Sequence, residues 1–245
     1  MGNSGISSFY DKDAEEYDKR WSQRGGSKTA QFQQSIVSEL TNDWDGKIIA
    51  EIGCGSGRFS TYLASKGNPQ ILLDIALQML KVTRSKMVIL DQQFIGTNGS
   101  VYSLPFRSDN FDAVYSINVF NHLENPENAL SEVNRILKTN GLFLVNFANL
   151  YSYYWPMAIF INRKQKSIGR NVYSKWLSVE TIKKLLNELG FEILKSVGNV
   201  YVPIYLDQPV VREIPLLLNY ISSKSILKWI APSIFFLCRK ENSIC

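Results

Sequence analysis

Three alternating glycines follow a short apolar run in the first quarter of the chain. Gly53, Gly55 and Gly57 come directly after residues 47–52, which contain the acid Glu51, and a helical pattern begins behind them. Glycine lets the backbone pass close to a ligand, and the exposed amides at the start of a helix favour polar or anionic groups. This arrangement is typical of a pocket for a nucleoside cofactor.

A second acid closes the next apolar run. Asp74 ends residues 70–74, where a carboxylate can accept hydrogen bonds from both hydroxyls of a ribose. The alternative is that Asp74 caps the helix that follows it. The dinucleotide pattern G-x-G-x-x-G needs its third glycine at position 58, and the chain has Arg58 there, so a nicotinamide cofactor is disfavoured.

The only histidine, His122, follows the apolar run at residues 111–117. An imidazole titrates near neutrality, so His122 could remove a proton from an attacking hydroxyl group. Alternatively, it only hydrogen-bonds the start of the next helix. We expect no metal, because one histidine and three scattered cysteines, Cys54, Cys238 and Cys245, cannot make a closed zinc site.

Strand and helix patterns alternate from residue 47 onward. We expect strands at residues 47–52, 70–74, 93–96, 111–117, 142–147, 191–197 and 233–239. The helices expected among them lie at residues 58–66, 76–85, 126–137 and between Ser178 and Gly190. Asn125 and Ser178 are the predicted caps of the last two. The alternation predicts an α/β fold: a Rossmann-like, seven-stranded, mostly parallel sheet with helices on both faces.

The order and spacing of these motifs resemble those of the class I S-adenosylmethionine-dependent methyltransferases, particularly the small-molecule branch with the ubiquinone and menaquinone methyltransferases. Residues 51–57 (EIGCGSG) look like the family's first motif, and residues 74–80 (DIALQML) are similar to its ribose-binding acid and the helix behind it. Residues 104–112 resemble the entry to the fourth strand, and residues 137–141 resemble the turn before the fifth. The resemblance covers residues 9–197.

The resemblance implies that the cofactor is S-adenosylmethionine. Asp74 would hold its ribose, and Asn118 would line its methionine end. Ile75 and Met79 would pack against the adenine. The full set implied to contact the cofactor is Tyr10, Tyr17, Glu51, Gly53, Cys54, Gly55, Asp74, Ile75, Met79, Ser100, Val101 and Asn118.

Three residues of this set have more specific expected roles. Glu51 would support the glycine turn and reach the amino group of the methionine. Cys54 is expected to pack, because the turn needs a small side chain. Ser100 stands where the family usually has an acid, so it would accept from the adenine amino group without the help of a charge.

Helical patterns at residues 9–21 and 29–40 precede the first strand, with a glycine-rich break at residues 24–27. Tyr10 and Tyr17 are seven residues apart and share one helix face. The first of these segments resembles the family's N-terminal lid, in which the tyrosines would cover the cofactor; alternatively, they anchor the helix to the core. We expect a single domain, residues 1–245, with a helical lid, a substrate-side insertion and a C-terminal helical insertion before the last strand at residues 1–44, 148–177 and 200–232.

Residues 149–160 are rich in aromatic side chains, and the resemblance places the acceptor pocket near them. Aromatic and apolar walls suit a planar or lipid-like acceptor, although ordinary core packing or a dimer contact explains them equally well. The basic residues 163–166 follow directly. Together with the apolar segment they could make a peripheral contact with an anionic membrane, whereas a solvated loop explains the charges just as well.

We therefore predict an S-adenosylmethionine-dependent methyltransferase that acts on a small, apolar or aromatic acceptor by in-line displacement. The net charge of +5 and the pI near 9.0 keep an RNA or ribosomal methyltransferase as an alternative. Nucleic acid is disfavoured, since residues 116–120 lack the Asn/Asp-Pro-Pro-Tyr/Phe motif of nucleobase methylation. A non-catalytic cofactor-binding partner subunit is the other alternative. The cysteine pattern and the missing signal peptide predict a cytoplasmic protein.

Overall fold

The computed structural model describes residues 3–22, 25–156, 159, 163, 174–199 and 225–242. The strands are β1 (Ile49–Ile52), β2 (Gln70–Asp74), β3 (Phe94–Asn98), β4 (Phe111–Ser116), β5 (Leu137–Ala148), β6 (Phe191–Asn199) and β7 (Ser233–Lys240). The α-helices are α1 (Asn3–Ser22), α2 (Gly25–Leu40), α3 (Ser60–Ala64), α4 (Leu77–Ile89), α5 (Pro126–Ile136) and α7 (Val179–Glu188). Short 3-10 helices are η1 (Phe120–His122) and η4 (Ile226–Ile230).

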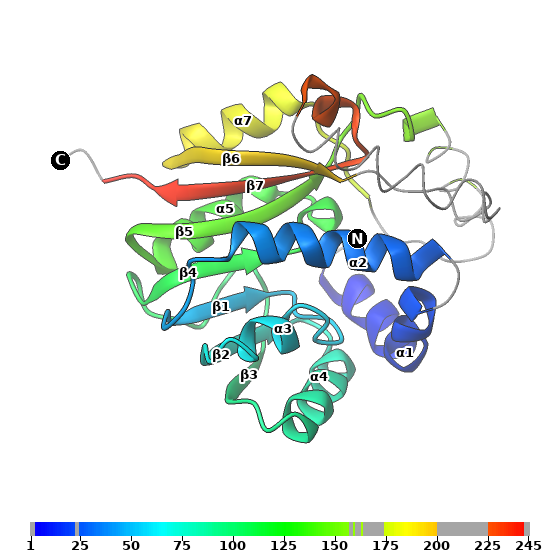
Figure 1. Ribbon diagram of the computed structural model, residues 1–245, viewed down its shortest axis with the longest axis vertical. Helices are drawn as coiled ribbons and strands as arrows, with labels where there is room; N and C mark the ends of the chain where they lie inside the picture. Colours follow the sequence, from blue (N-terminus) through cyan, green and yellow to red (C-terminus); the bar gives the residue numbers. More distant parts are fainter. Residues whose placement is uncertain are drawn as a thin grey trace.

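The strands form one seven-stranded sheet in the order β3-β2-β1-β4-β5-β7-β6 (Figure 1). Neighbouring strands from β3 to β5 run parallel, whereas β7 runs antiparallel to both β5 and β6. The predicted seven-stranded, mostly parallel sheet is therefore confirmed. The strand order reverses between β1 and β4, and open α/β sheets bind ligands at the carboxyl ends of the strands beside such a point.

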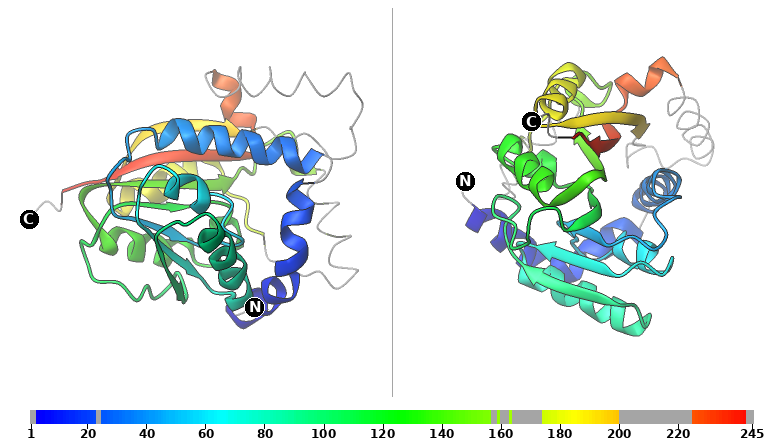
Figure 2. Two further views of the ribbon diagram at one scale, coloured as in Figure 1. Left: turned by 60° about the horizontal axis from the view of Figure 1, so that its bottom comes forward. Right: turned by 90° about the vertical axis from the view of Figure 1, so that its left-hand side faces the viewer.

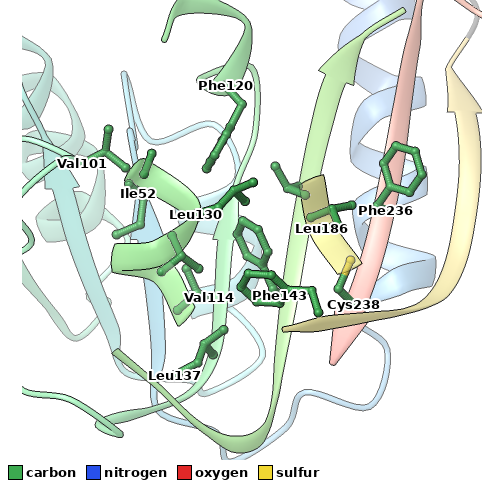
Figure 3. Packing of buried hydrophobic residues seen from close by; sticks show 14 of the residues in the cluster. Ile52, Val101, Val114, Phe120, Leu130, Leu137, Phe143, Leu186, Phe236 and Cys238 are labelled. Atoms are coloured by element: carbon green, nitrogen blue, oxygen red, sulfur yellow. The ribbon is translucent and has the colours of Figure 1, made fainter. Parts of the chain in front are cut away.

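Helices cover both faces of the sheet, because the central strands are apolar on both sides. Alternate residues of β4 point to opposite layers. Tyr115 packs in the layer of α2, and Val114 packs in the layer of α5 and α7. Figure 3 shows Leu130 of α5 and Leu186 of α7 directed at the strands, with Phe143 of β5 between them. Full burial of one such side chain contributes about 1.5–3 kcal/mol, so these layers hold the strand ends in place.

Strand β5 begins earlier than the sequence pattern indicates. We expected a turn at residues 137–141, but Leu137 already pairs with Phe111 of β4. The next registered pair, Ala113 with Leu142, lies two residues further along β4 and five further along β5. The extra residues form a bulge in which Asn140 has a φ of 61°, a left-handed conformation that asparagine tolerates.

The predicted helix boundaries hold in one case and shift in others. Ser178 caps α7 as predicted, because its hydroxyl accepts from the Thr181 amide at 3.1 Å. Asn125 takes the N-cap position of α5, but its side chain makes no capping hydrogen bond. Helix α2 begins at Gly25 rather than at residue 29, so the expected break is shorter; glycine is tolerated where a helix begins.

The two N-terminal helices are placed differently. Helix α2 runs along one face of the sheet, whereas α1 lies across the carboxyl ends of the parallel strands (Figures 1 and 2). The expected lid and insertions stay predictions, and residues 157–158, 160–162, 164–173 and 200–224 lie outside the described residues. Within the described part of the chain, no helix is both long and apolar enough to cross a membrane.

Candidate functional site

Helix α1 crosses the sheet edge at the carboxyl ends of the parallel strands (Figure 2). A cavity lies there, lined by residues at the ends of β1, β2 and β4 and by residues of α1. It comprises about 770 Å³ of empty space, part of which is open to solvent. Apart from Glu51 and Cys54, every residue predicted to form the site lies on its wall. These residues are Tyr10, Tyr17, Gly53, Gly55, Asp74, Ile75, Met79, Ser100, Val101, Asn118 and His122.

The glycine turn forms the floor of the cavity. Gly53 and Gly55 have φ angles of 77° and 53°, in the left-handed region that favours glycine. A Cβ atom on Gly53 would lie 2.3 Å from Cγ2 of Val119, so no side chain fits there. A Cβ atom on Gly55 would meet nothing within 4 Å. The backbone at Gly55 therefore borders open space that a ligand can fill.

Asp74 ties the turn to the second strand. Its Oδ2 accepts from the Gly55 amide at 2.7 Å, and its Oδ1 accepts from the Ala76 amide at 2.8 Å. Burial raises the pKa of this carboxyl group, while the two backbone hydrogen bonds lower it. Ala76, not Asp74, is the N-cap residue of α4. Each carboxylate oxygen keeps a further acceptor position, so Asp74 can still receive the hydroxyls of a ribose.

An apolar slot continues from Asp74 towards β3. Ile75, Met79 and Val101 line it, and such side chains suit the faces of a purine ring. Ser100 lies beside the slot, and its Oγ accepts from the Tyr102 amide at 3.3 Å. The hydroxyl can make only a neutral hydrogen bond to an adenine amino group, in place of the charged one that an acid would make.

Glu51 lies beneath the glycine turn rather than on the cavity wall, where we predicted it. Side chains alternate along β1, so Glu51 faces the layer of α2 and α3 and is 1% exposed. Its Oε2 accepts from Ser60 Oγ at the start of α3 and, at 2.7 Å, from Tyr115 Oη. Burial raises the pKa of Glu51 to about 8 against the effect of both hydrogen bonds. The predicted support of the turn and the predicted contact with the methionine amino group stay predictions, and the side chain is not among those lining the cavity.

Cys54 also points away from the cavity. Its side chain packs with Leu72, Leu80 and Met87 in a cluster between the sheet and α4. Burial raises the pKa of its thiol well above the ordinary value, so the group stays protonated at neutral pH. This placement agrees with its expected packing role and differs from the predicted contact with the cofactor.

Helix α1 covers the cavity and is fastened at both ends. Ser7 Oγ donates to the Ile75 carbonyl at 3.1 Å, and Asp11 Oδ1 accepts from the Gln78 amide at 2.8 Å. Further along, Asp18 forms an ion pair with Lys86 of α4. The two tyrosines of α1 pack in a cluster with Met79 and Ala76, which agrees with the anchoring role, and they also line the cavity. That they cover the cofactor stays a prediction.

His122 lies in η1, opposite α1. Its Nε2 is 3.3 Å from Tyr10 Oη, and the two rings meet edge to face with centroids 6.1 Å apart. The imidazole is therefore on the cavity wall and has a hydroxyl partner on the covering helix. A histidine in this position can take up a proton from a group bound in the cavity.

The structure adds residues that the sequence motifs did not indicate. Ile6, Ile117 and Leu123 extend the apolar wall of the cavity. Behind the wall, Gln33 and Asn146 hydrogen-bond to Asn118. The apolar wall could have been inferred from the apolar residues next to each motif, whereas the contacts of Gln33 join segments far apart in the sequence. Among the residues described, no group of three His, Cys, Asp or Glu side chains could hold a metal ion.

The cavity fits a nucleoside cofactor. The open space beside Gly55, the buried carboxylate of Asp74 and the slot between Ile75 and Met79 match the backbone, ribose and purine contacts that such a molecule needs. With the strand order β3-β2-β1-β4, a purine held between Ile75 and Met79 would lie towards β3, and the other end of such a ligand would lie towards β4.

Comparison with known proteins agrees with this assignment. A family model described as a methyltransferase domain matches residues 50–145. An uncharacterised protein of Methanocaldococcus jannaschii is 26% identical to this chain, and the aligned region spans 98% of this chain and 92% of that protein. A ubiquinone biosynthesis O-methyltransferase of Ruegeria sp. is 24% identical over 78% of this chain and 82% of its own.

The fold is shared with solved structures. Magnesium protoporphyrin IX methyltransferase from Synechocystis, solved with bound S-adenosylhomocysteine, has a TM-score of 0.72 at 14% identity over 98% of this chain and 100% of that chain. An S-adenosylmethionine-dependent methyltransferase from Thermotoga maritima has a TM-score of 0.66 at 19% identity over 97% of this chain and 100% of that chain.

The sheet and its cavity define a Rossmann-like enzyme with a nucleoside cofactor. Residues 50–145 form a methyltransferase domain, the fold is that of the class I S-adenosylmethionine-dependent methyltransferases, and the cofactor is S-adenosylmethionine.

Proposed function

We propose that this methyltransferase acts on a small acceptor with an apolar or aromatic body. The observation that carries the proposal is a set of exposed aromatic side chains just beyond the carboxyl end of β5. Tyr151, Tyr153 and Trp155 are 68%, 47% and 38% exposed. Parallel strands end at the same edge of the sheet as the cavity, so these side chains are available to an acceptor that approaches it.

The relatives support an acceptor of this kind. One of the similar proteins above is named for ubiquinone biosynthesis, and another for magnesium protoporphyrin IX. Ubiquinone is a strongly apolar molecule, and a porphyrin is planar. Aromatic walls bind such molecules by burying their apolar surface, and a few polar groups then fix their orientation. The basic residues at 163–166 lie mostly outside the described residues, so the predicted membrane contact stays a prediction.

The side chains of the cavity would contribute chiefly by positioning. When bound, S-adenosylmethionine supplies an activated methyl group on a positively charged sulfur. Asp74 would hold the ribose, and Tyr10 and Tyr17 would exclude water from above. Holding two reactants at near-attack distance can lower the barrier by about 7–11 kcal/mol relative to the bimolecular reaction.

His122 would act on acceptors that must lose a proton. Its Nε2 could receive the proton of an acceptor hydroxyl while Tyr10 Oη keeps the ring oriented. A carbanion or an amine in its neutral form needs no such base. The proposal therefore links the need for His122 to the chemistry of the acceptor.

Two measurements test the proposed function. Isothermal titration calorimetry with S-adenosylhomocysteine should show one site per chain. The enzyme should then release S-adenosylhomocysteine when S-adenosylmethionine is supplied with quinols, phenols or fatty acids. Binding without release from any of these acceptors would favour the non-catalytic partner subunit, and release only with RNA would overturn the small-molecule assignment.

A further inference from the structure

A buried polar network lies behind the β4 end of the cavity. Asn118 has a φ of 62°, which is uncommon for a residue other than glycine. Its amide donates to Asn146 Oδ1 at 2.6 Å, and its Oδ1 accepts from Asn146 Nδ2 at 2.9 Å. Asn146 Nδ2 also donates to Ser233 Oγ at 2.8 Å. The side-chain amide of Asn146 thus clamps both the backbone N–H and the side-chain oxygen of Asn118.

Helix α2 holds the same residue from the other side. Gln33 is fully buried, and its Oε1 accepts from Asn118 Nδ2 at 3.3 Å. The same oxygen accepts from the Arg58 guanidinium at 2.5 Å. The guanidinium stacks on the ring of Phe59, with 4.5 Å between its central carbon and the ring centroid. The charged guanidinium of Arg58 therefore fixes the Gln33 side chain that also binds Asn118.

Such a network has a cost that its members must offset. Burying an amide is unfavourable unless its hydrogen bonds are made. A plain apolar contact would join α2, β5 and β7 without this cost. Three of the five hydrogen bonds end on Asn118, which lines the cavity, and the other two hold its partners Asn146 and Gln33; this arrangement points to a role in holding Asn118.

We infer that Gln33 and Asn146 are positioning residues for the amino-acid end of S-adenosylmethionine, acting through Asn118. This deepens the proposed function and rests on it. The cavity runs from Ser100 and Asp74, beside β3 and β2, to Asn118 at the end of β4. With the adenosine at the first end, the amino acid lies at the second. Neither Gln33 nor Asn146 touches the cavity itself.

The test compares two ligands that differ only at this end. S-adenosylhomocysteine carries the amino acid, whereas 5′-methylthioadenosine lacks it. Gln33→Met removes the amide at similar volume and should weaken S-adenosylhomocysteine about tenfold, the effect of one lost hydrogen bond at a buried site. Binding of 5′-methylthioadenosine should change less than about twofold, which also reports that the variant is folded.

Two further variants complete the test. Gln33→Glu keeps an acceptor for Asn118 and Arg58 and should retain most of the affinity for S-adenosylhomocysteine. Gln34→Met is the matched control, because Gln34 is the next residue of α2 and its Nε2 has no hydrogen-bond partner in the described structure. It should leave both ligands unaffected.

The outcomes separate the inference from the function on which it rests. If Gln33→Met leaves S-adenosylhomocysteine binding unchanged, or weakens both ligands equally, Gln33 does not position the amino-acid end and the inference is wrong. If the unmodified protein binds neither ligand, the proposed function fails first. Asn146→Leu should also weaken the binding of S-adenosylhomocysteine more than that of 5′-methylthioadenosine. If only Gln33→Met shows this difference between the two ligands, Asn146 is not a positioning residue.

Discussion

Two buried acids lie near the carboxyl ends of neighbouring strands and have different surroundings. Glu51 in β1 lies on what we call the underside of the glycine turn, where Ser60 and Tyr115 contact it. Asp74 at the end of β2 lies on the open side, at the cavity. Burial raises the pKa of both groups. They differ in their partners: two hydroxyl groups for Glu51, and two backbone amides for Asp74.

The difference shows how one turn separates stability from binding. With a pKa of about 8, Glu51 is mostly protonated at neutral pH and needs no charged partner. Asp74 receives two backbone N–H groups that favour its ionised form, which is the form that accepts ribose hydroxyls. Changes at Glu51 should therefore alter unfolding, and changes at Asp74 should alter ligand affinity. Four predictions test the surroundings of the turn and of these two acids.

The two glycines of the floor should separate most clearly. Gly53→Ala forces a Cβ atom to 2.3 Å from Val119 Cγ2 in a left-handed conformation, so we expect it to destabilise the fold by about 3 kcal/mol. Gly55→Ala meets no neighbour within 4 Å and should cost only about 1–2 kcal/mol. Chemical denaturation measures both values, and equal losses would contradict the different surroundings of the two residues.

Asp74→Asn should have the largest effect on binding. It replaces one acceptor oxygen by an NH2 group that faces a backbone amide, and it removes the charge that strengthens the ribose hydrogen bonds. We expect the affinity for S-adenosylhomocysteine to fall about 100-fold, measured by calorimetry.

Asp91→Asn is the matched control for this substitution. Asp91 follows α4 away from the cavity and has a φ of 50°, which asparagine also accepts. The control should bind as the unmodified protein does. Similar losses in both variants would mean that the Asp74 carboxylate has no special part in binding.

Glu51→Gln should change the pH dependence of stability. The folded-state pKa of Glu51 is about 8 against 4.5 when unfolded, so the folded state retains a proton that the unfolded state has lost. The contribution of this group to stability therefore decreases as pH rises from roughly 5 to 8. Between pH 6 and pH 8, the unmodified protein should lose about 2 kcal/mol relative to Glu51→Gln.

Denaturant unfolding at the two pH values measures this difference directly. Titrations of other groups occur in both proteins and cancel. S-adenosylhomocysteine affinity should stay within about twofold, since Glu51 does not line the cavity. A parallel pH dependence in the two proteins, or a large loss of affinity, would show that Glu51 does not have the buried, protonated role.

The smallest expected effect is at the covering helix. Tyr10→Phe removes the hydroxyl beside His122 Nε2 and should weaken S-adenosylhomocysteine by about two- to threefold, because the ring still packs on Met79. His122 is the only histidine, so its imidazole signals in an NMR spectrum need no assignment. They should move when S-adenosylhomocysteine binds. Unmoved signals at saturation would place the ligand away from His122.

The sequence predicted the open side of the turn better than the underside. Gly53, Gly55 and Asp74 could be recognised because short local patterns determine them, and the strand order then brings them together. The direction of Glu51 could have been read from the alternation along β1, which sends Ile52 and Glu51 to opposite layers.

Other features could not be predicted, because they depend on contacts between distant segments. The clamp on Asn118 joins residues 33, 118, 146 and 233. The bulge in β5 depends on its register with β4. The antiparallel direction of β7 also had no local signal, since an apolar strand has the same pattern in either direction.

A crystal structure with S-adenosylhomocysteine bound tests the central claim most directly. The account predicts both ribose hydroxyls within about 2.5–3.2 Å of the Asp74 carboxylate, the adenine between Ile75 and Met79, and the amino-acid end beside Asn118. A ligand bound outside this cavity, or with its ribose away from Asp74, would contradict the account.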